Sequence, residues 1–165
     1  MSTLKEFLKE LKEESIVTRK MLQRIPVDKQ DWRPHAKSMS IQQLAGHLAD
    51  LANWISMAFT TLEMDFEKSP EKPADWKNNE ELLDLFEKGL AGAIQHLESG
   101  NEEDLDPMWT LRSGETIFMQ ITRRELVRHA MSQTIHHRAQ LGVFLRLLDV
   151  PIPGTYGPSA DEQEF

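Results

Sequence analysis

Histidines are the residues in this sequence best suited to chemistry. The chain has six histidines and no cysteine, which excludes disulfide scaffolds, thiolate zinc sites and cysteine nucleophiles. Three of the histidines, His129, His136 and His137, lie in one helical segment together with Gln133. Gln133 and His137 are four residues apart, so a helix places them one turn apart on the same face. His129 and His136 share a neighbouring face. This segment can therefore present two donor side chains to one point.

His47 lies in a second helical segment and is the candidate for a third donor. The leucines at 44, 48 and 51 flank it, which indicates that it points toward the interior. A third ligand from a facing helix is what an open, three-coordinate metal site in a helix bundle requires. The structural alternative is a buried histidine that binds a backbone carbonyl or a carboxylate, and the residues alone leave both interpretations open. We expect His35 to be a loop or capping residue, and His96 to stabilise the end of a helix.

Four stretches of helical periodicity must position these histidines. They cover about residues 4–24, 40–62, 78–100 and 122–148, and prolines separate them. Thr3, Ser40 and Thr122 each precede a Glu or Gln by three residues, which is the spacing of a capping box. Residues 63–77 are polar and predict a long crossover, while the partial alternation of residues 109–121 is compatible with a short hairpin. The sequence predicts one all-α domain over residues 1–165, a four-helix bundle.

Charge and composition exclude several classes of function. The net charge is −8 and the isoelectric point is near 5.2, which argues against binding to nucleic-acid phosphates or to an anionic membrane surface. The sequence has neither a run of about 18 apolar residues nor the apolar core of a signal peptide, so we expect a cytoplasmic protein. It also lacks a Ser-His-Asp pattern, a phosphate-binding glycine loop and a dinucleotide fingerprint. The residues therefore assign neither a catalytic group nor an organic cofactor.

Two further features have a structural interpretation. Residues 98–107 are rich in Asp and Glu but lack the glycine and terminal glutamate of a calcium loop, so we expect a solvated acidic loop. Tryptophans and methionines at helical spacing could line a cavity for an apolar ligand, but such residues more often belong to a core. The tryptophans concerned are Trp32, Trp54, Trp76 and Trp109.

The chain resembles the DinB/YfiT-like family of metal-dependent proteins over nearly its whole length. The resemblance depends on Arg33-Pro34-His35, on His47-Leu48-Ala49, on the segment His136-His137-Arg138-Ala139-Gln140-Leu141, and on residues 150–162. It implies an up-down-down-up four-helix bundle that forms a homodimer. It also implies a divalent metal, nickel or zinc, held by three histidines, two of them four residues apart on the last helix. By position, the metal ligands here are His47, Gln133 and His137.

Two positions depart from the family pattern. Gln133 stands where the family usually has histidine, and its neutral amide oxygen is a poorer ligand for nickel or zinc than imidazole. We therefore expect weaker metal binding, with the Gln133 oxygen or water as the third ligand. Ala139 replaces the usual glycine, which a helix tolerates easily.

The resemblance also implies a class of reaction. Some relatives are thiol S-transferases or isomerases that use a low-molecular-weight thiol, and others are hydrolases. For this chain we expect a metal-dependent transferase or hydrolase acting on a small molecule, with Asp50, Arg138 and Gln140 as candidate contacts of the site. The alternative is a non-enzymatic stress-response or small-ligand-binding bundle with a degenerate metal site. Nucleic acid and membrane partners are not expected.

Overall fold

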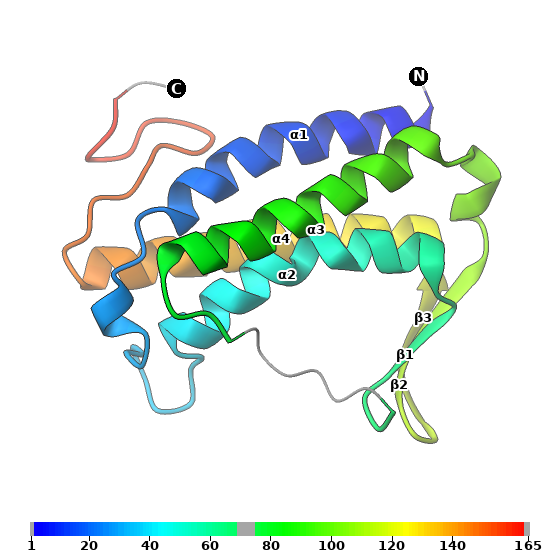
Figure 1. Ribbon diagram of the computed structural model, residues 1–165, viewed down its shortest axis with the longest axis horizontal. Helices are drawn as coiled ribbons and strands as arrows, with labels where there is room; N and C mark the ends of the chain where they lie inside the picture. The colour runs from blue at the N-terminus through cyan, green and yellow to red at the C-terminus, as the bar shows by residue number, and fades with distance from the viewer. Residues whose placement is uncertain (1, 69–74, 164–165) are drawn as a thin grey trace.

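Four long helices form the body of the protein (Figure 1). The computed structural model describes residues 2–68 and 75–163. The helices are α1 (Thr3–Leu22), α2 (Ile41–Thr60), α3 (Asn79–Ser99) and α4 (Arg123–Leu147). In Figure 1, α1 and α4 run in one direction, and α2 and α3 run in the opposite one. Both α1 and α2 pack against α3 and α4, so each helix has two neighbours.

Side-chain caps fix where the helices begin. Ser40 and Thr122 form the two predicted reciprocal capping boxes, with Gln43 and Glu125 respectively. At α1 the prediction is wrong by one residue, because the N-cap is Ser2 and not Thr3. These caps satisfy backbone N–H groups that the helix itself leaves without partners.

A three-stranded sheet lies at one end of the helices, so the prediction of an all-α fold is wrong. The strands are β1 (Glu63–Asp65), β2 (Met108–Ser113) and β3 (Thr116–Thr122), in the order β1-β2-β3. β2 and β3 form an antiparallel hairpin that spans the segment 109–121, which alternates in the sequence, whereas β1 pairs with β2 in parallel. The sequence did not predict β1, because its partner is more than forty residues away and a three-residue strand has no readable period. Residues 69–74 of the predicted 63–77 crossover lie outside the described residues.

The core forms where the apolar stripes of the four helices meet. Trp54, Trp76 and Trp109 are buried in it, and Trp32 packs against its edge. The indole N–H of Trp76 donates to the carbonyl of Gln42, at 3.1 Å, and that of Trp109 donates to a threonine hydroxyl. These tryptophans therefore belong to the core, as the sequence predicted.

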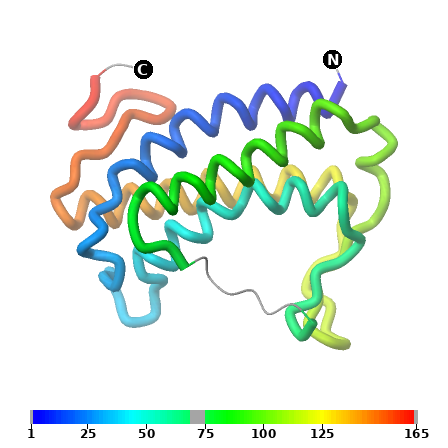
Figure 2. The backbone as a smooth tube through the Cα atoms, in the orientation of Figure 1, coloured from blue at the N-terminus to red at the C-terminus, as the bar shows by residue number. Residues whose placement is uncertain are grey.

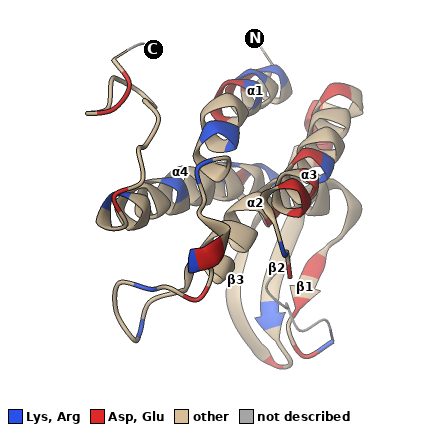
Figure 3. Cartoon of the chain, turned by 60° about the vertical axis from the view of Figure 1, so that its left-hand side comes forward, with Lys and Arg blue, Asp and Glu red and all other residues tan. Residues whose placement is uncertain are grey.

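Charged residues of both signs are interspersed along α1 and α3 (Figure 3). Lys12 pairs with Glu98 at 2.9 Å, and Arg19 pairs with Glu87, so ion pairs link these two helices at the surface. None of the helices in the described residues has the length and apolar character needed to cross a bilayer.

The chain after α4 turns back along the bundle (Figure 2). We call residues 150–163 the tail. Arg24 on the loop after α1 pairs with Glu162, and Arg146 on α4 pairs with Asp161. The tail is thus held against α4 and against the loop that follows α1.

Candidate metal site

His47 on α2 and His137 on α4 face each other inside the bundle. Their ring centroids are 4.7 Å apart and their planes are inclined by 80°. His137 is 9% exposed, and His47 is half-buried between leucines 44, 48 and 51, all of which are buried. The two helices pack directly on each other, and this contact brings together residues that are ninety positions apart in the sequence.

Burial keeps both rings neutral. Burial lowers the pKa of His47 below its ordinary value, although the negative charge of Asp50 opposes the shift. Burial also lowers the pKa of His137, and the neighbouring rings of His47 and His136 lower it further, while its hydrogen bond to Gln140 has the opposite effect. At neutral pH each imidazole therefore has one nitrogen with a free lone pair, which is the form that binds a metal.

Gln140 sets the orientation of His137. The Nδ1 of His137 lies 2.8 Å from the Oε1 of Gln140. An amide oxygen only accepts hydrogen bonds, so Nδ1 carries the proton and Nε2 keeps the lone pair. Metal-binding histidines usually donate their second N–H to an oxygen in this way. The sequence predicted Gln140 as a contact of the site but not this role, although residues three apart on a helix are neighbours.

Gln133 lies one turn before His137 but is hydrogen-bonded elsewhere. Its Nε2 is 3.3 Å from the Nε2 of His129, one turn further toward the N-terminus. Within the described residues, the Oε1 of Gln133 takes part in no hydrogen bond. The oxygen that the sequence predicted as a metal ligand therefore has no hydrogen-bond partner in the described residues.

The other two predicted contacts of the site, Asp50 and Arg138, lie on different sides of α4. Asp50 lies near His47, one turn along α2, and its Oδ1 accepts a hydrogen bond from Asn53 at 2.6 Å. Arg138 points away from the histidines and binds Glu14 and Thr18 on α1. Consecutive residues of a helix point about 100° apart, which explains why Arg138 does not share the site of His137.

His35 and His96 occupy structural positions. His35 is exposed, and its Nδ1 accepts the backbone N–H of Lys37 at 3.1 Å. The Nδ1 of His96 is 2.8 Å from the carbonyl oxygen of Gly92, and its ring stacks on Phe59 near the end of α3. Both match the structural interpretations made from the sequence.

The two rings are about as far apart as the imidazoles of a shared metal ion would be, but the described residues show no complete metal site. Two rings that bind an ion at about 2.0–2.1 Å lie about 5 Å apart between centroids, close to the separation seen here. Over residues 2–68 and 75–163, no three His, Asp or Glu side chains come together in a way that could hold a metal ion. A third protein ligand would therefore have to be of another type, such as the amide oxygen of Gln133.

Several solved structures, among them two DinB-like proteins, have a fold similar to this one. A DinB-like protein from Bacillus subtilis is 19% identical, with a TM-score of 0.69, and the match covers 96% of this chain and 99% of that one. A DinB-like protein from Bacillus cereus is 18% identical, with a TM-score of 0.68, over 91% of this chain and 95% of that one. At this level of identity the likeness shows a shared fold.

A third similar structure has a named activity. It is a mycothiol-dependent maleylpyruvate isomerase, 16% identical with a TM-score of 0.57, and the match covers 86% of this chain and 63% of that one. No curated protein matches the chain. The sequence profile of the DinB family matches residues 1–164, and the chain therefore belongs to the DinB family.

Proposed function

We propose that the protein binds a divalent metal ion, nickel or zinc, through His47 and His137, with Gln133 as the third protein donor. The observation that carries the proposal is the 4.7 Å separation of the two rings inside the bundle. Burial keeps both rings neutral, so neither has to lose a proton before it binds an ion.

The third donor determines how tightly the ion is held. The Gln133 oxygen has no hydrogen-bond partner in the described part of the chain, so its use would break only the contact of Gln133 Nε2 with His129. An amide oxygen binds nickel or zinc more weakly than imidazole does. We therefore expect a site that exchanges its metal readily.

A thiol S-transferase or a hydrolase is the activity that such a site would support. A bound divalent ion would lower the pKa of a coordinated thiol or water. The likeness of the fold to a mycothiol-dependent isomerase favours a low-molecular-weight thiol as the partner. In the chain itself, Gln140 would keep the Nε2 of His137 directed at the ion, and Asp50 would place a negative charge beside His47.

Metal analysis of protein purified without a histidine tag tests the proposal. We expect nickel or zinc to remain with the chain and to raise its melting temperature, because an ion that binds only the folded state stabilises it. His47→Ala and His137→Ala should each abolish metal retention. His96→Ala is the matched control and should not change it, since His96 bonds within α3.

Two results would contradict the proposal. One is a metal content below about a tenth of an ion per chain together with no rise in melting temperature when nickel or zinc is added. The other is unchanged retention in both the His47 and the His137 variant, which would place the ion elsewhere.

A further inference from the structure

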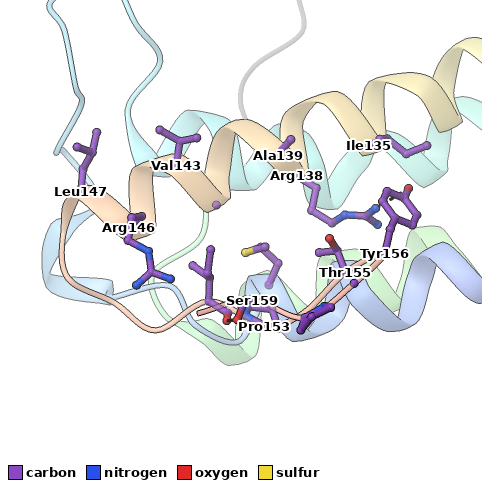
Figure 4. A pocket seen from close by; sticks show the side chains of 15 residues that line it. Ile135, Arg138, Ala139, Val143, Arg146, Leu147, Pro153, Thr155, Tyr156 and Ser159 are labelled. Atoms are coloured by element: carbon purple, nitrogen blue, oxygen red, sulfur yellow. Dashed lines mark hydrogen bonds between the residues drawn. The ribbon is translucent and has the colours of Figure 1, made fainter. Parts of the chain in front are cut away.

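A cavity lies on the opposite side of α4 from His47, between that helix and the tail. Its volume is about 520 Å³, within the range of about 300–1,000 Å³ that is typical of small-molecule sites. Figure 4 shows α4 on one side of this space and tail residues Pro153, Thr155 and Ser159 on the other. We call it the tail cavity. Neither histidine of the candidate metal site lines it.

The wall of the tail cavity is mostly apolar. Met21 of α1, Val143 and Leu147 of α4, and Ile152 of the tail supply much of it. Val143 and Leu147 are 59% and 58% exposed, although water contact with large apolar side chains is unfavourable. A ligand with an aliphatic part would cover them.

Two arginines line the cavity, and each already has an acidic partner. Arg138 has a side chain that is 3% exposed, and its Nη1 lies 2.6 Å from Glu14 Oε2. Arg146 pairs with Asp161. Neither Glu14 nor Asp161 lines the cavity, so the polar side chains of the lining are two arginines and several residues with hydroxyl groups. The positive charge of each guanidinium is balanced by a carboxylate that is not part of the lining.

Two hydrogen-bond donors of this lining have no partner among the residues that the structure describes. Arg138 uses Nη1 for Glu14 and Thr18 and Nη2 for Tyr156, but within the described residues nothing accepts a hydrogen bond from its Nε–H. The hydroxyl of Thr155 likewise takes part in no hydrogen bond there, and it projects from the tail toward α4 in Figure 4. These two groups would both be satisfied by an acceptor oxygen on a ligand.

We propose that the tail cavity binds a small, uncharged, mainly aliphatic molecule with a carbonyl oxygen, such as a ketone or an ester. Its aliphatic part packs on Val143 and Leu147, and its oxygen accepts hydrogen bonds from Arg138 Nε–H and Thr155 Oγ1–H. A cation is disfavoured by the two arginines. A carboxylate is disfavoured because each arginine is already neutralised, so burying a further negative charge there would be costly.

The tail wall is held in place before any ligand binds. The hydroxyl of Tyr156 accepts from Arg138 and donates to Glu14, both at 2.8 Å. Asp161 also accepts the backbone N–H of Ile152, at 2.9 Å. A preformed wall reduces the entropy lost on binding.

Titration with three probes of matched chain length tests the proposal. The probes are 2-octanone, octanoate and octylammonium, and binding is followed by NMR through the ¹H–¹⁵N signal of Arg138 Nε–H and the amides of residues 139–157. We expect 2-octanone to shift these signals and to bind at least about tenfold more tightly than either charged probe. Equal affinity for octanoate would overturn the assignment of an uncharged ligand, and no binding of 2-octanone at millimolar concentration would overturn the site.

Substitutions locate the binding. Val143→Asp places a charge in the apolar wall and should weaken 2-octanone at least about tenfold, whereas Ile16→Asp, a change at an equally exposed apolar residue outside the cavity, should not. Thr155→Val removes one hydroxyl and should weaken the ketone about threefold to tenfold. Unchanged affinity in Val143→Asp would contradict the proposal. So would a dimer in solution that Val143→Asp dissociates and that 2-octanone leaves intact, because a second copy would then cover this face.

Discussion

At the scale of single residues, position 133 decides how well the candidate site holds a metal. Gln133→His would place an imidazole one turn before His137, the spacing at which two side chains of one helix can share an ion. We expect nickel and zinc affinity to rise by roughly tenfold or more, since imidazole is the better ligand for both. Competition with a coloured chelator measures the change.

Gln95→His is the matched control for that substitution, because Gln95 is exposed on α3. It should leave the affinity as it is. If Gln133→His also leaves it as it is, position 133 does not face the ion.

Gln140 is the second residue on which the site depends. Gln140→Leu would remove the oxygen that holds the Nδ1–H of His137, so both tautomers of the ring should become populated. The ¹⁵N shifts of His137 report this in metal-free protein, and metal affinity should fall by about 10–100-fold. Gln140→Glu keeps an acceptor and should retain the single tautomer. A single Nδ1–H tautomer in Gln140→Leu would show that another group orients the ring.

The sequence was informative about which histidines meet and less so about what surrounds them. The leucines around His47 indicated an inward ring, and the structure places that ring beside His137. The hydrogen bond of Gln133 to His129 was not predictable, because it depends on a rotamer choice between two neighbours one turn apart on the same helix. The sequence prediction assigned Arg138 to the same site as His137. In the structure Arg138 points elsewhere, because adjacent residues of a helix point to different neighbours.

At the scale of the elements, the capping box of α4 links stability to pH. Thr122 donates its backbone N–H and its hydroxyl to Glu125, and these bonds lower the pKa of that carboxyl. The box therefore stabilises the fold above the ordinary glutamate pKa, and this contribution is lost as pH falls through the lowered value. Thr122→Ala should lower the free energy of unfolding by about 1 kcal/mol at neutral pH.

Urea unfolding at several pH values checks this prediction. The difference between the Thr122→Ala variant and the original chain should shrink as Glu125 becomes protonated, because the bond to the charged carboxylate is then lost in both. Thr60→Ala is the control: its hydroxyl bonds within α2, to the carbonyl of Ser56, and no titrating group is involved. A Thr122→Ala effect that is constant with pH would contradict the role of the carboxylate.

The elements also show where local sequence patterns stop being sufficient. Periodicity located all four helices, because each buries a stripe longer than three turns. It did not reveal that Glu102, in the acidic loop, accepts the backbone N–H of Leu4 at 3.0 Å and so helps to cap α1. That contact joins residues 98 positions apart, and only the packed fold brings them together.

At the scale of the whole molecule, α4 serves two separate regions of the fold. One face presents His137 to α2, and the next residue, Arg138, turns to α1 and the tail. Packing α4 between α1 and α2 thus separates the candidate metal site from the tail cavity by the width of one helix. The two proposals can therefore fail independently.

The ion pair between Arg146 and Asp161 makes the position of the tail depend on pH. Arg146 lowers the pKa of Asp161, so the ionised pair holds the tail above the ordinary aspartate pKa and is lost as pH falls through the lowered value. Asp161→Asn should mimic that loss at neutral pH. We expect faster hydrogen exchange at the Ile152 amide, whose N–H donates to Asp161, and weaker 2-octanone binding, because one wall of the tail cavity is then less ordered.

Asp84→Asn is the control for Asp161→Asn. It breaks an exposed pair with Lys88 on α3 and should change neither measurement. If Ile152 exchanges at the same rate in both variants, the apolar contacts of Ile152 and Pro153 hold the tail without the ion pair.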